Sequence, residues 1–209
     1  MILAATFPNA TYMGLPVLEA MYGPWARSVA IQYDLFACTP ILLTAGILLA
    51  AHFGNSGEKP NPLMLLIKVP PLWAAIVATS LNLAGVEPVA WITGLLSMMG
   101  GAVIPLMLFA VGLALKQGFE EIRYLPTIVP VILLQLFIMP LVVLGTAILL
   151  NIDGELRTAV ILEAAMPSMA LGVVLCDRYG LNTGIYAASV TVTTLLSLFT
   201  LPLWYSWMV

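Results

Sequence analysis

Long uninterrupted apolar runs recur along the 209-residue chain, and they limit its possible folds more than any other feature. Each run has about 18 residues or more, which at about 1.5 Å of helical rise per residue is enough to cross a hydrocarbon layer about 30 Å thick. Only 8% of the residues are charged and 62% are hydrophobic, so the chain has too little polar surface to enclose a water-soluble globule. The pattern predicts an all-α integral membrane protein.

Apolar length and Pro/Gly punctuation predict about seven transmembrane helices. We expect them at 2–21, 25–51, 63–84, 88–115, 125–150, 156–177 and 183–208. The clearly hydrophilic segment is 53–62, whose Gly, Asn and Pro residues end one helix and delay the next. Lys and Arg in short loops resist translocation, and five of them, including Lys59, fall on the side of this loop against two on the other. This bias predicts that the loop is cytoplasmic.

The charged residues and cysteines argue against nucleic acid, metal cofactors and catalysis. Seven Lys/Arg and ten Asp/Glu give a formal net charge of -3, without a basic cluster that could follow a phosphate backbone. Cys38 and Cys176 lie in apolar runs, outside any Cys/His spacing that holds a metal. A single histidine and no nucleophile motif leave an intramembrane enzyme without catalytic groups. We therefore expect no enzyme activity, no cofactor and no nucleic-acid partner.

The first apolar run contains an unusual group of helix-breaking and polar residues at 8–16 (PNATYMGLP). Pro16 lacks an N–H and its ring clashes with a carbonyl one turn earlier, while Gly14 lets the backbone unwind, so we expect a broken helix there. Non-helical backbone at membrane depth is tolerated where it lines protein or a cavity, and the exposed helix N-terminus attracts an anion. Asn9 and Thr11 would add hydrogen bonds to the same ligand. The alternative is a simple proline kink in which both side chains bond to neighbouring backbone.

The sixth run repeats this arrangement at 163–172 (EAAMPSMALG), where Pro167 and Gly172 stand about one helical turn apart beside Ser168. The first two runs also resemble the last two, because in each pair a helix with Pro and Gly ends at Tyr-Gly and a Thr-bearing helix follows. The second copy begins five runs after the first, and each run crosses the membrane once. Because five is an odd number, the two copies have opposite orientations, as an inverted repeat requires. We expect the two broken helices to cross and to form one site near the midplane of the bilayer.

A few polar side chains could couple transport to an ion or line the cavity. Glu19 and Glu163 lie in or beside the broken helices, and either could be a proton-coupling group. We favour a position for both near the outer interface, where water solvates them. Asp34 and Gln135 could line the cavity, with Arg27 as a structural partner for Asp34.

Three stretches of the chain resemble the auxin efflux carrier family of transporters. FPNATYMGLPVLEAMYG at 7–23 is similar to the family's crossover helix, whose plant PIN members share an LPN-x-x-x-MGIP-like pattern ending in Met-Tyr-Gly. AAMPSMALGVVLCDRYG at 164–180 resembles the matching helix of the second repeat. SMMGGAVIPLMLFAVGLAL at 97–115 resembles the family's small-residue helix, which ends in Phe-x-x-Gly-Leu.

The resemblance implies a fold of ten helices in two inverted repeats of five, in which the fourth and ninth helices cross at the substrate site. It aligns residues 1–52 with the last two helices of the first repeat, with the broken helix at 1–23. Residues 53–62 become the cytoplasmic loop, and 63–209 the complete second repeat, with its broken helix at 156–179. The family's first three helices have no counterpart in the sequence, which implies a fragment or a truncated gene prediction without about half of the scaffold.

The resemblance also implies a function, namely a multi-pass transporter of the plasma (inner) membrane that carries a small organic anion by alternating access. Auxin-like acids, malonate and malate are the expected substrates, a proton or sodium ion the coupling ion, and a homodimer the full-length form. Asn9 matches the asparagine implicated in holding a substrate carboxylate, whereas Gly172 stands where plant members have proline. The predicted substrate-binding residues are Asn9, Thr11, Gly14, Pro16, Pro167, Ser168 and Gly172.

Two other functions fit the same residues. A sodium-coupled carboxylate symporter of the bile-acid-carrier kind also has crossing broken helices. It needs a cluster of acidic and hydroxyl ligands around the break, where the sequence offers only Thr11, Ser168 and Glu163. The second is a membrane receptor that keeps the fold and binds its ligand without transporting it. No feature of the sequence distinguishes such a receptor from a carrier.

Overall fold

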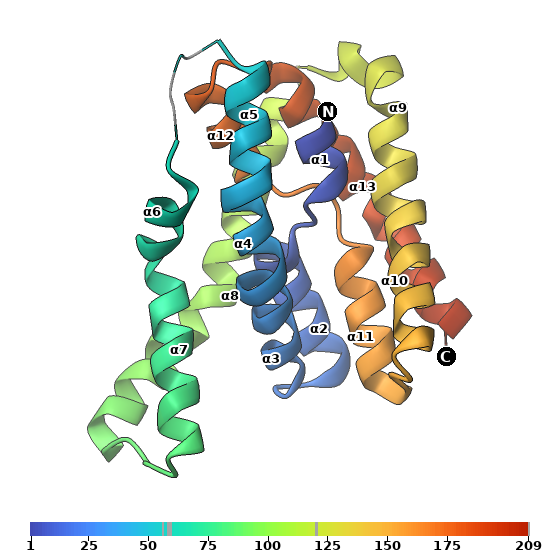
Figure 1. Ribbon diagram of the computed structural model, residues 1–209. Helices are drawn as coiled ribbons and strands as arrows, with labels where there is room; N and C mark the ends of the chain where they lie inside the picture. The colour runs from blue at the N-terminus through green and yellow to red at the C-terminus, as the bar shows by residue number, and fades with distance from the viewer. Residues whose placement is uncertain (56, 58–59, 120, 209) are drawn as a thin grey trace.

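The computed structural model describes residues 1–55, 57, 60–119 and 121–208, and these residues form helices without a β-strand. The helices pack side by side in an elongated bundle, with the first and last helices of the chain next to each other (Figure 1). Within the loop predicted at 53–62, Ser56, Glu58 and Lys59 lie outside the described residues. The all-helical fold predicted from the apolar runs is therefore confirmed for the part of the chain that the structure describes.

Among the described residues, four continuous helices are long and apolar enough to cross a bilayer, and they match the second, fourth, fifth and seventh predicted runs. The first is Ala26–Phe53, made of α3 (Ala26–Gln32), η2 (Tyr33–Cys38), α4 (Thr39–Ile41), η3 (Leu42–Gly46) and α5 (Ile47–Phe53). The second is Ala90–Leu115, which lies in α8 (Ala90–Phe119), and the third is Leu125–Leu149, made of α9 (Leu125–Leu133), η5 (Leu134–Ile138) and α10 (Met139–Leu149). The fourth is α13 (Thr183–Met208). A short turn, η4 (Ile122–Tyr124), precedes α9.

The other three predicted runs form shorter helices because each is interrupted. The first contains α1 (Ile2–Thr6), η1 (Ala10–Gly14) and α2 (Leu15–Tyr22); the third contains α6 (Pro62–Ile67) and α7 (Pro70–Leu83); the sixth contains α11 (Gly154–Ala164) and α12 (Gly172–Arg178). We call residues 7–9 the first unwound segment and residues 165–171 the second unwound segment. These two interruptions position the candidate site.

The helix break expected at Pro16 is wrong, because the chain unwinds about two turns earlier, beside Pro8. The N–H of Gly14 donates to the carbonyl of Asn9 at 3.0 Å, a π-helical bond across five residues, and η1 then continues directly into α2. A π turn contains one extra residue, which moves aside the carbonyl that a proline ring would otherwise meet. The same arrangement recurs where η2 precedes Pro40 and η5 precedes Pro140. These prolines are therefore accommodated within continuous helices.

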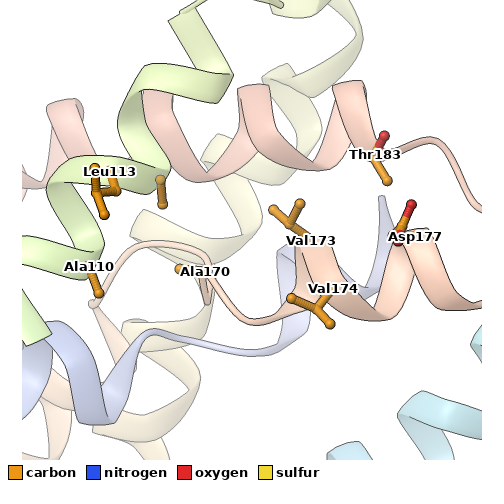
Figure 2. Close-up of a pocket in the computed structure, with 8 residues that line it drawn as sticks. Ala110, Leu113, Ala170, Val173, Val174, Asp177 and Thr183 are labelled. Carbon is orange, nitrogen blue, oxygen red and sulfur yellow. The ribbon is translucent and has the colours of Figure 1, made fainter.

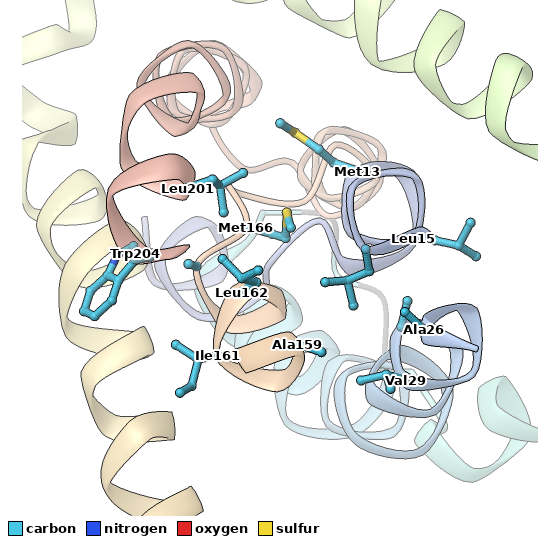
Figure 3. Packing of buried hydrophobic residues seen from close by; sticks show 13 residues of the cluster. Met13, Leu15, Ala26, Val29, Ala159, Ile161, Leu162, Met166, Leu201 and Trp204 are labelled. Atoms are coloured by element: carbon cyan, nitrogen blue, oxygen red, sulfur yellow. The ribbon is translucent and has the colours of Figure 1, made fainter. Parts of the chain in front are cut away.

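Two clusters of buried apolar side chains hold the bundle together. The first joins η1, α2, α3, α11 and α13, and Figure 3 shows Leu162 and Met166 at its centre with Met13 and Leu201 around them. The second joins α1, η3, α5, α9, α12 and α13. In contrast, α7 has no buried residue among those described, and α7 and α8 form one side of the bundle in Figure 1. Apolar faces of this kind are suited to contact with lipid.

Candidate functional site

The two unwound segments cross and pair through their main chains. The N–H of Asn9 donates to the carbonyl of Pro167 at 2.7 Å, and the N–H of Met169 donates to the carbonyl of Phe7 at 3.0 Å. These bonds make an isolated antiparallel bridge between the segments. Each break therefore supplies the hydrogen-bond partners that the other lacks, as non-helical backbone within a bilayer requires.

Side chains from neighbouring helices hold the second unwound segment in place. Ser168 is fully buried, its Oγ donates to the carbonyl of Ala4 at 2.6 Å, and its N–H donates to Oγ1 of Thr193 at 3.1 Å. Gln135 is also fully buried, and its Nε2 donates to the carbonyl of Met166 at 3.0 Å. Gln135, which was predicted to line a cavity, lines neither of the two cavities described below. Its amide is needed as a donor because the carbonyls at the end of α11 have no helical partner.

Asn9 combines burial with unused hydrogen-bonding capacity. Its side chain is 3% exposed, and its Nδ2 has no hydrogen-bond partner among the described residues. It directly precedes η1 and therefore stands at the N-terminus of the η1–α2 helix. A helix N-terminus carries partial positive charge and free N–H groups, and a buried unpaired donor costs about 1–3 kcal/mol. The position thus presents donors to whatever group binds beside it.

Thr11 is held by an acidic side chain. Its hydroxyl donates to Oδ2 of Asp34, and the hydroxyl of Thr39 donates to Oδ1 of the same carboxylate at 3.3 Å. The expected pairing of Arg27 with Asp34 is wrong, since the Nε of Arg27 binds Oε2 of Glu19 at 2.5 Å. Arg27 stands in the first turn of α3, about 10 Å along the helix from Asp34 but directly across a tight turn from the end of α2.

Glu163 is fully buried, and neither of its carboxylate oxygens has a hydrogen-bond partner among the described residues. The expectation that water at the outer interface solvates Glu163 is therefore wrong. The reason is packing: α11 lies against η1, α2 and α3, and a Cβ atom added at Gly14 would overlap the Glu163 carboxylate. Glu19, in contrast, is partly exposed beside Arg27.

Two of the remaining predicted site residues have roles in packing. Gly172 begins α12, where a Cβ atom would overlap the hydroxyl of Tyr186 on α13, so glycine is needed for the close approach of the two helices. Pro16 is buried in the first turn of α2 and, as proline, has no N–H to donate. Neither residue presents a polar group to a ligand.

Two of the cavities in the described part of the chain border α12, and the predicted site residues line neither of them. The larger, of about 530 Å³, adjoins the second unwound segment and is lined by Ala110, Leu113, Ala114, Ala170, Val173, Val174, Asp177 and Thr183 (Figure 2). The second, of about 360 Å³, lies among α1, α5, α12 and α13. Both volumes are within the usual range for small-molecule sites, about 300–1,000 Å³. Asp177 and Thr183, the polar residues that line the larger cavity, were not predicted from the sequence. The one feature of the sequence that could have indicated them is their position at helix ends after the second break.

Comparisons with known proteins agree with this architecture. A family model described as membrane transport protein matches residues 60–205. An uncharacterized transporter of Methanothermobacter thermautotrophicus is 31% identical over 203 residues, which cover 97% of this chain and 65% of the relative. The uncharacterized transporter YfdV of Escherichia coli K12 is 28% identical over 208 residues, covering 97% of this chain and 65% of the relative. The probable auxin efflux carrier component 5b of Oryza sativa subsp. japonica is 25% identical over 244 residues, which cover 96% of this chain and 66% of the relative.

The chain spans about 65% of the length of the curated relatives that it matches first. The matched region begins after α5, so the family model covers the second unwound segment, and the full-length relatives extend the similarity to the first. Together with the long apolar helices, these matches show that the chain is a multi-pass integral membrane protein. It belongs to the membrane transport protein family, as its resemblance to the auxin efflux carriers predicted.

Proposed function

We propose that the protein is a secondary transporter that carries a small organic anion across the membrane by alternating access around the helix crossing. Auxin-like acids and dicarboxylates such as malonate or malate are the proposed substrates. The observation that supports the proposal best is the buried, unpaired amide of Asn9 at the N-terminus of the η1–α2 helix. A carboxylate is the natural complement of such a site, because it accepts hydrogen bonds and its charge is favourable at a helix N-terminus.

The burial of Asn9 is compatible with a carrier. Its side chain is 3% exposed, so an anion can reach it only after the helices around it move. The cavity of about 530 Å³ beside the second unwound segment would be the path on one side of the membrane. A site that is closed to water while a neighbouring cavity is open is what one conformation of an alternating-access transporter requires. Conversely, a channel would need a continuous aqueous path.

We also propose that the interrupted and continuous helices correspond to the fourth to tenth helices of two inverted five-helix repeats. Residues 1–52 would end the first repeat, 53–62 would form the cytoplasmic loop, and 63–209 would form the second repeat. The coverage of about 65% of the relatives' length supports this alignment. From the resemblance to the auxin efflux carriers we also propose a homodimer for the full-length form and the plasma membrane as its location.

The transport proposal can be tested with purified protein in liposomes. Vesicles loaded with unlabelled malonate, malate or indole-3-acetate are diluted into the labelled acid, and counterflow of label into the vesicles reports a carrier. Asn9→Asp keeps the size of the side chain but replaces its donors with a negative charge, so we expect counterflow to fall by at least tenfold, about 1.4 kcal/mol. Asn9→Ala should also lose binding, while both variants should elute from size exclusion like the wild type.

The matched control is Asn82→Ala, at the exposed end of α7, which should leave counterflow unchanged. Wild-type counterflow in the Asn9→Asp variant would contradict the proposed site. Saturable binding of the labelled acid to the wild type without any counterflow would indicate the receptor function instead.

A further inference from the structure

We propose that Glu163 and Asp34 form a proton site beside the helix crossing, and that a proton bound there crosses the membrane together with the organic anion. This inference rests on the proposed transport function and deepens it by naming the coupling ion and the residues that bind it. It follows from the position of Glu163, from the groups around it and from its separation from Asn9.

Among the described residues, Glu163 has no partner that could stabilise a permanent negative charge. It is fully buried, both of its oxygens lack a hydrogen-bond partner among the described residues, and its neighbour Leu162 is fully buried in the first apolar cluster. Arg27, the cation on the adjacent helix α3, is bound to Glu19. An isolated carboxylate in such surroundings is strongly unfavourable, whereas a carboxyl group that carries a proton is tolerated.

The groups that face Glu163 come from the helices packed against α11. The segment η2 supplies Asp34, which is bound to the hydroxyl of Thr11 on η1, together with the titratable side chains of Tyr33 and Cys38. The segment η1 contributes Gly14, whose missing side chain makes room for the carboxylate.

The remaining neighbouring helices add no charge that could pair with Glu163. On α2 and α3, Glu19 and Arg27 bind each other. On α13, Tyr205 packs against Tyr22 of α2, and α10 contains no titratable residue. Asp34 is therefore the acidic residue bound to the same segment, η1, against which the Glu163 carboxylate lies.

The donor set suits a proton better than a metal ion. A metal ion must exchange its water shell for several oxygen ligands at once, whereas a proton needs a single carboxylate oxygen. The hydroxyls of Thr11 and Thr39 both donate to Asp34 and thus stabilise its charged form. Among the described residues, no three His, Cys, Asp or Glu side chains are grouped so that they could hold a metal. Asp34 already accepts two hydrogen bonds, whereas neither oxygen of Glu163 has a partner among the described residues, so we assign the proton to Glu163.

The proton site is one helical turn from the proposed anion site. The N–H of Gly14, beside which the Glu163 carboxylate lies, donates to the carbonyl of Asn9. A negative charge on Glu163 would repel an anion bound at Asn9, and protonation removes this repulsion. Coupling of this kind is reciprocal, so the bound anion also favours protonation of Glu163. One proton is taken up with the anion on one side and released with it on the other, and with a monovalent anion no net charge moves.

Proton binding can be tested without knowing the substrate. Infrared difference spectra of the purified protein in liposomes, recorded between alkaline and acidic pH, should contain the C=O band of a protonated buried carboxyl group. We expect Glu163→Gln to abolish this band and Asp34→Asn to shift both its frequency and its titration midpoint. Absence of the band in the wild type, or its persistence in Glu163→Gln, would overturn the assignment.

Coupling is tested in the same vesicles with labelled malonate, malate and indole-3-acetate. An inwardly directed proton gradient should accelerate wild-type uptake on the order of tenfold, the usual size of such coupling. Glutamine resembles the protonated carboxyl group at every pH, so Glu163→Gln should lose both the gradient stimulation and the pH dependence of counterflow. Glu19→Gln, the matched control, should keep both.

The possible failures can be told apart. If the wild type shows no counterflow of any acid, the transport proposal fails, while the infrared titration still decides whether Glu163 binds a proton. Gradient stimulation that survives in Glu163→Gln would overturn the coupling. Stabilisation of the wild type by NaCl but not by KCl, lost in Glu163→Gln, would assign the site to sodium and overturn the proton assignment. If Glu163→Gln fails to fold, Asp34→Asn still decides the question, because this variant must shift the titration midpoint of the Glu163 carboxyl band.

Discussion

The hydroxyl of Ser168 is the clearest place to test how the second unwound segment is held against α1, next to the crossing. It is fully buried and donates to the carbonyl of Ala4 at 2.6 Å, joining residues 164 positions apart in the chain. Ser168→Ala removes the donor and leaves the Ala4 carbonyl buried without it. Because only one oxygen atom is lost, the substitution creates little empty volume, and the effect is almost entirely that of the hydrogen bond.

The expected loss of stability can be worked out from this geometry. A typical hydrogen bond contributes about 1 kcal/mol net, and leaving a buried acceptor unpaired raises the cost to about 1–3 kcal/mol. We take about 2 kcal/mol, which lowers the ratio of folded to unfolded protein about 30-fold. The loosened crossing should also reduce transport, since Asn9 is held to the same segment through the carbonyl of Pro167.

The assay is unfolding of the purified protein in mixed micelles with increasing sodium dodecyl sulfate, followed by the fluorescence of its five tryptophans. The matched control is Ser206→Ala, whose exposed hydroxyl donates to the carbonyl of Leu203 within the same helix at 3.0 Å. The control should change stability by no more than about 0.5 kcal/mol. Equal unfolding curves for Ser168→Ala and Ser206→Ala would refute the idea that this bond holds the crossing.

Three further predictions follow from contacts around the site. Thr193→Val removes the acceptor for an N–H of the second unwound segment and should cost about 1–3 kcal/mol in the same detergent titration; an effect no larger than that of the surface control would contradict it. Gly172→Ala should cost about 1–3 kcal/mol because its methyl group overlaps Tyr186, and adding Tyr186→Leu should cost less than the sum of the two single changes; strict additivity would contradict the contact. Glu19→Gln and Arg27→Gln should leave unfolding and counterflow close to wild type, since water and salt screen this partly exposed pair; a large loss in either variant would give the pair a role in transport.

The location of the helix breaks could be predicted from the sequence only approximately. The proline-containing regions at 8–16 and 163–172 each overlap a break, and the second unwound segment contains Pro167 as expected. The rule that proline breaks a helix assumes the α-helical register, however, and the π turn of η1 changes that register before Pro16. A π turn has no distinctive composition, so the chain could not be assigned a break at Pro8 in preference to Pro16 from local residues alone.

The environment of the acidic residues could not be predicted for a different reason. Glu19 and Glu163 have similar neighbours in sequence, yet one pairs with Arg27 at a partly exposed position and the other is fully buried. The difference arises because η1 packs against α11 at Gly14, where the absence of a side chain makes room for a carboxylate. From the sequence, Gly14 was predicted to let the helix unwind, whereas in the structure it permits close contact between η1 and α11.

The sequence by itself determined that this protein lies in a lipid bilayer, that it is all-helical, and in which regions its membrane helices are interrupted. These properties depend on hydrophobicity summed over about 18 residues and on the local geometry of proline, both of which are properties of short segments. Only the tertiary structure decided that the two breaks pair with each other, that Thr11 binds Asp34 and that Glu163 is enclosed. Contacts of this kind join segments far apart in the chain, and their strength depends on the exclusion of water, which no short stretch of sequence specifies.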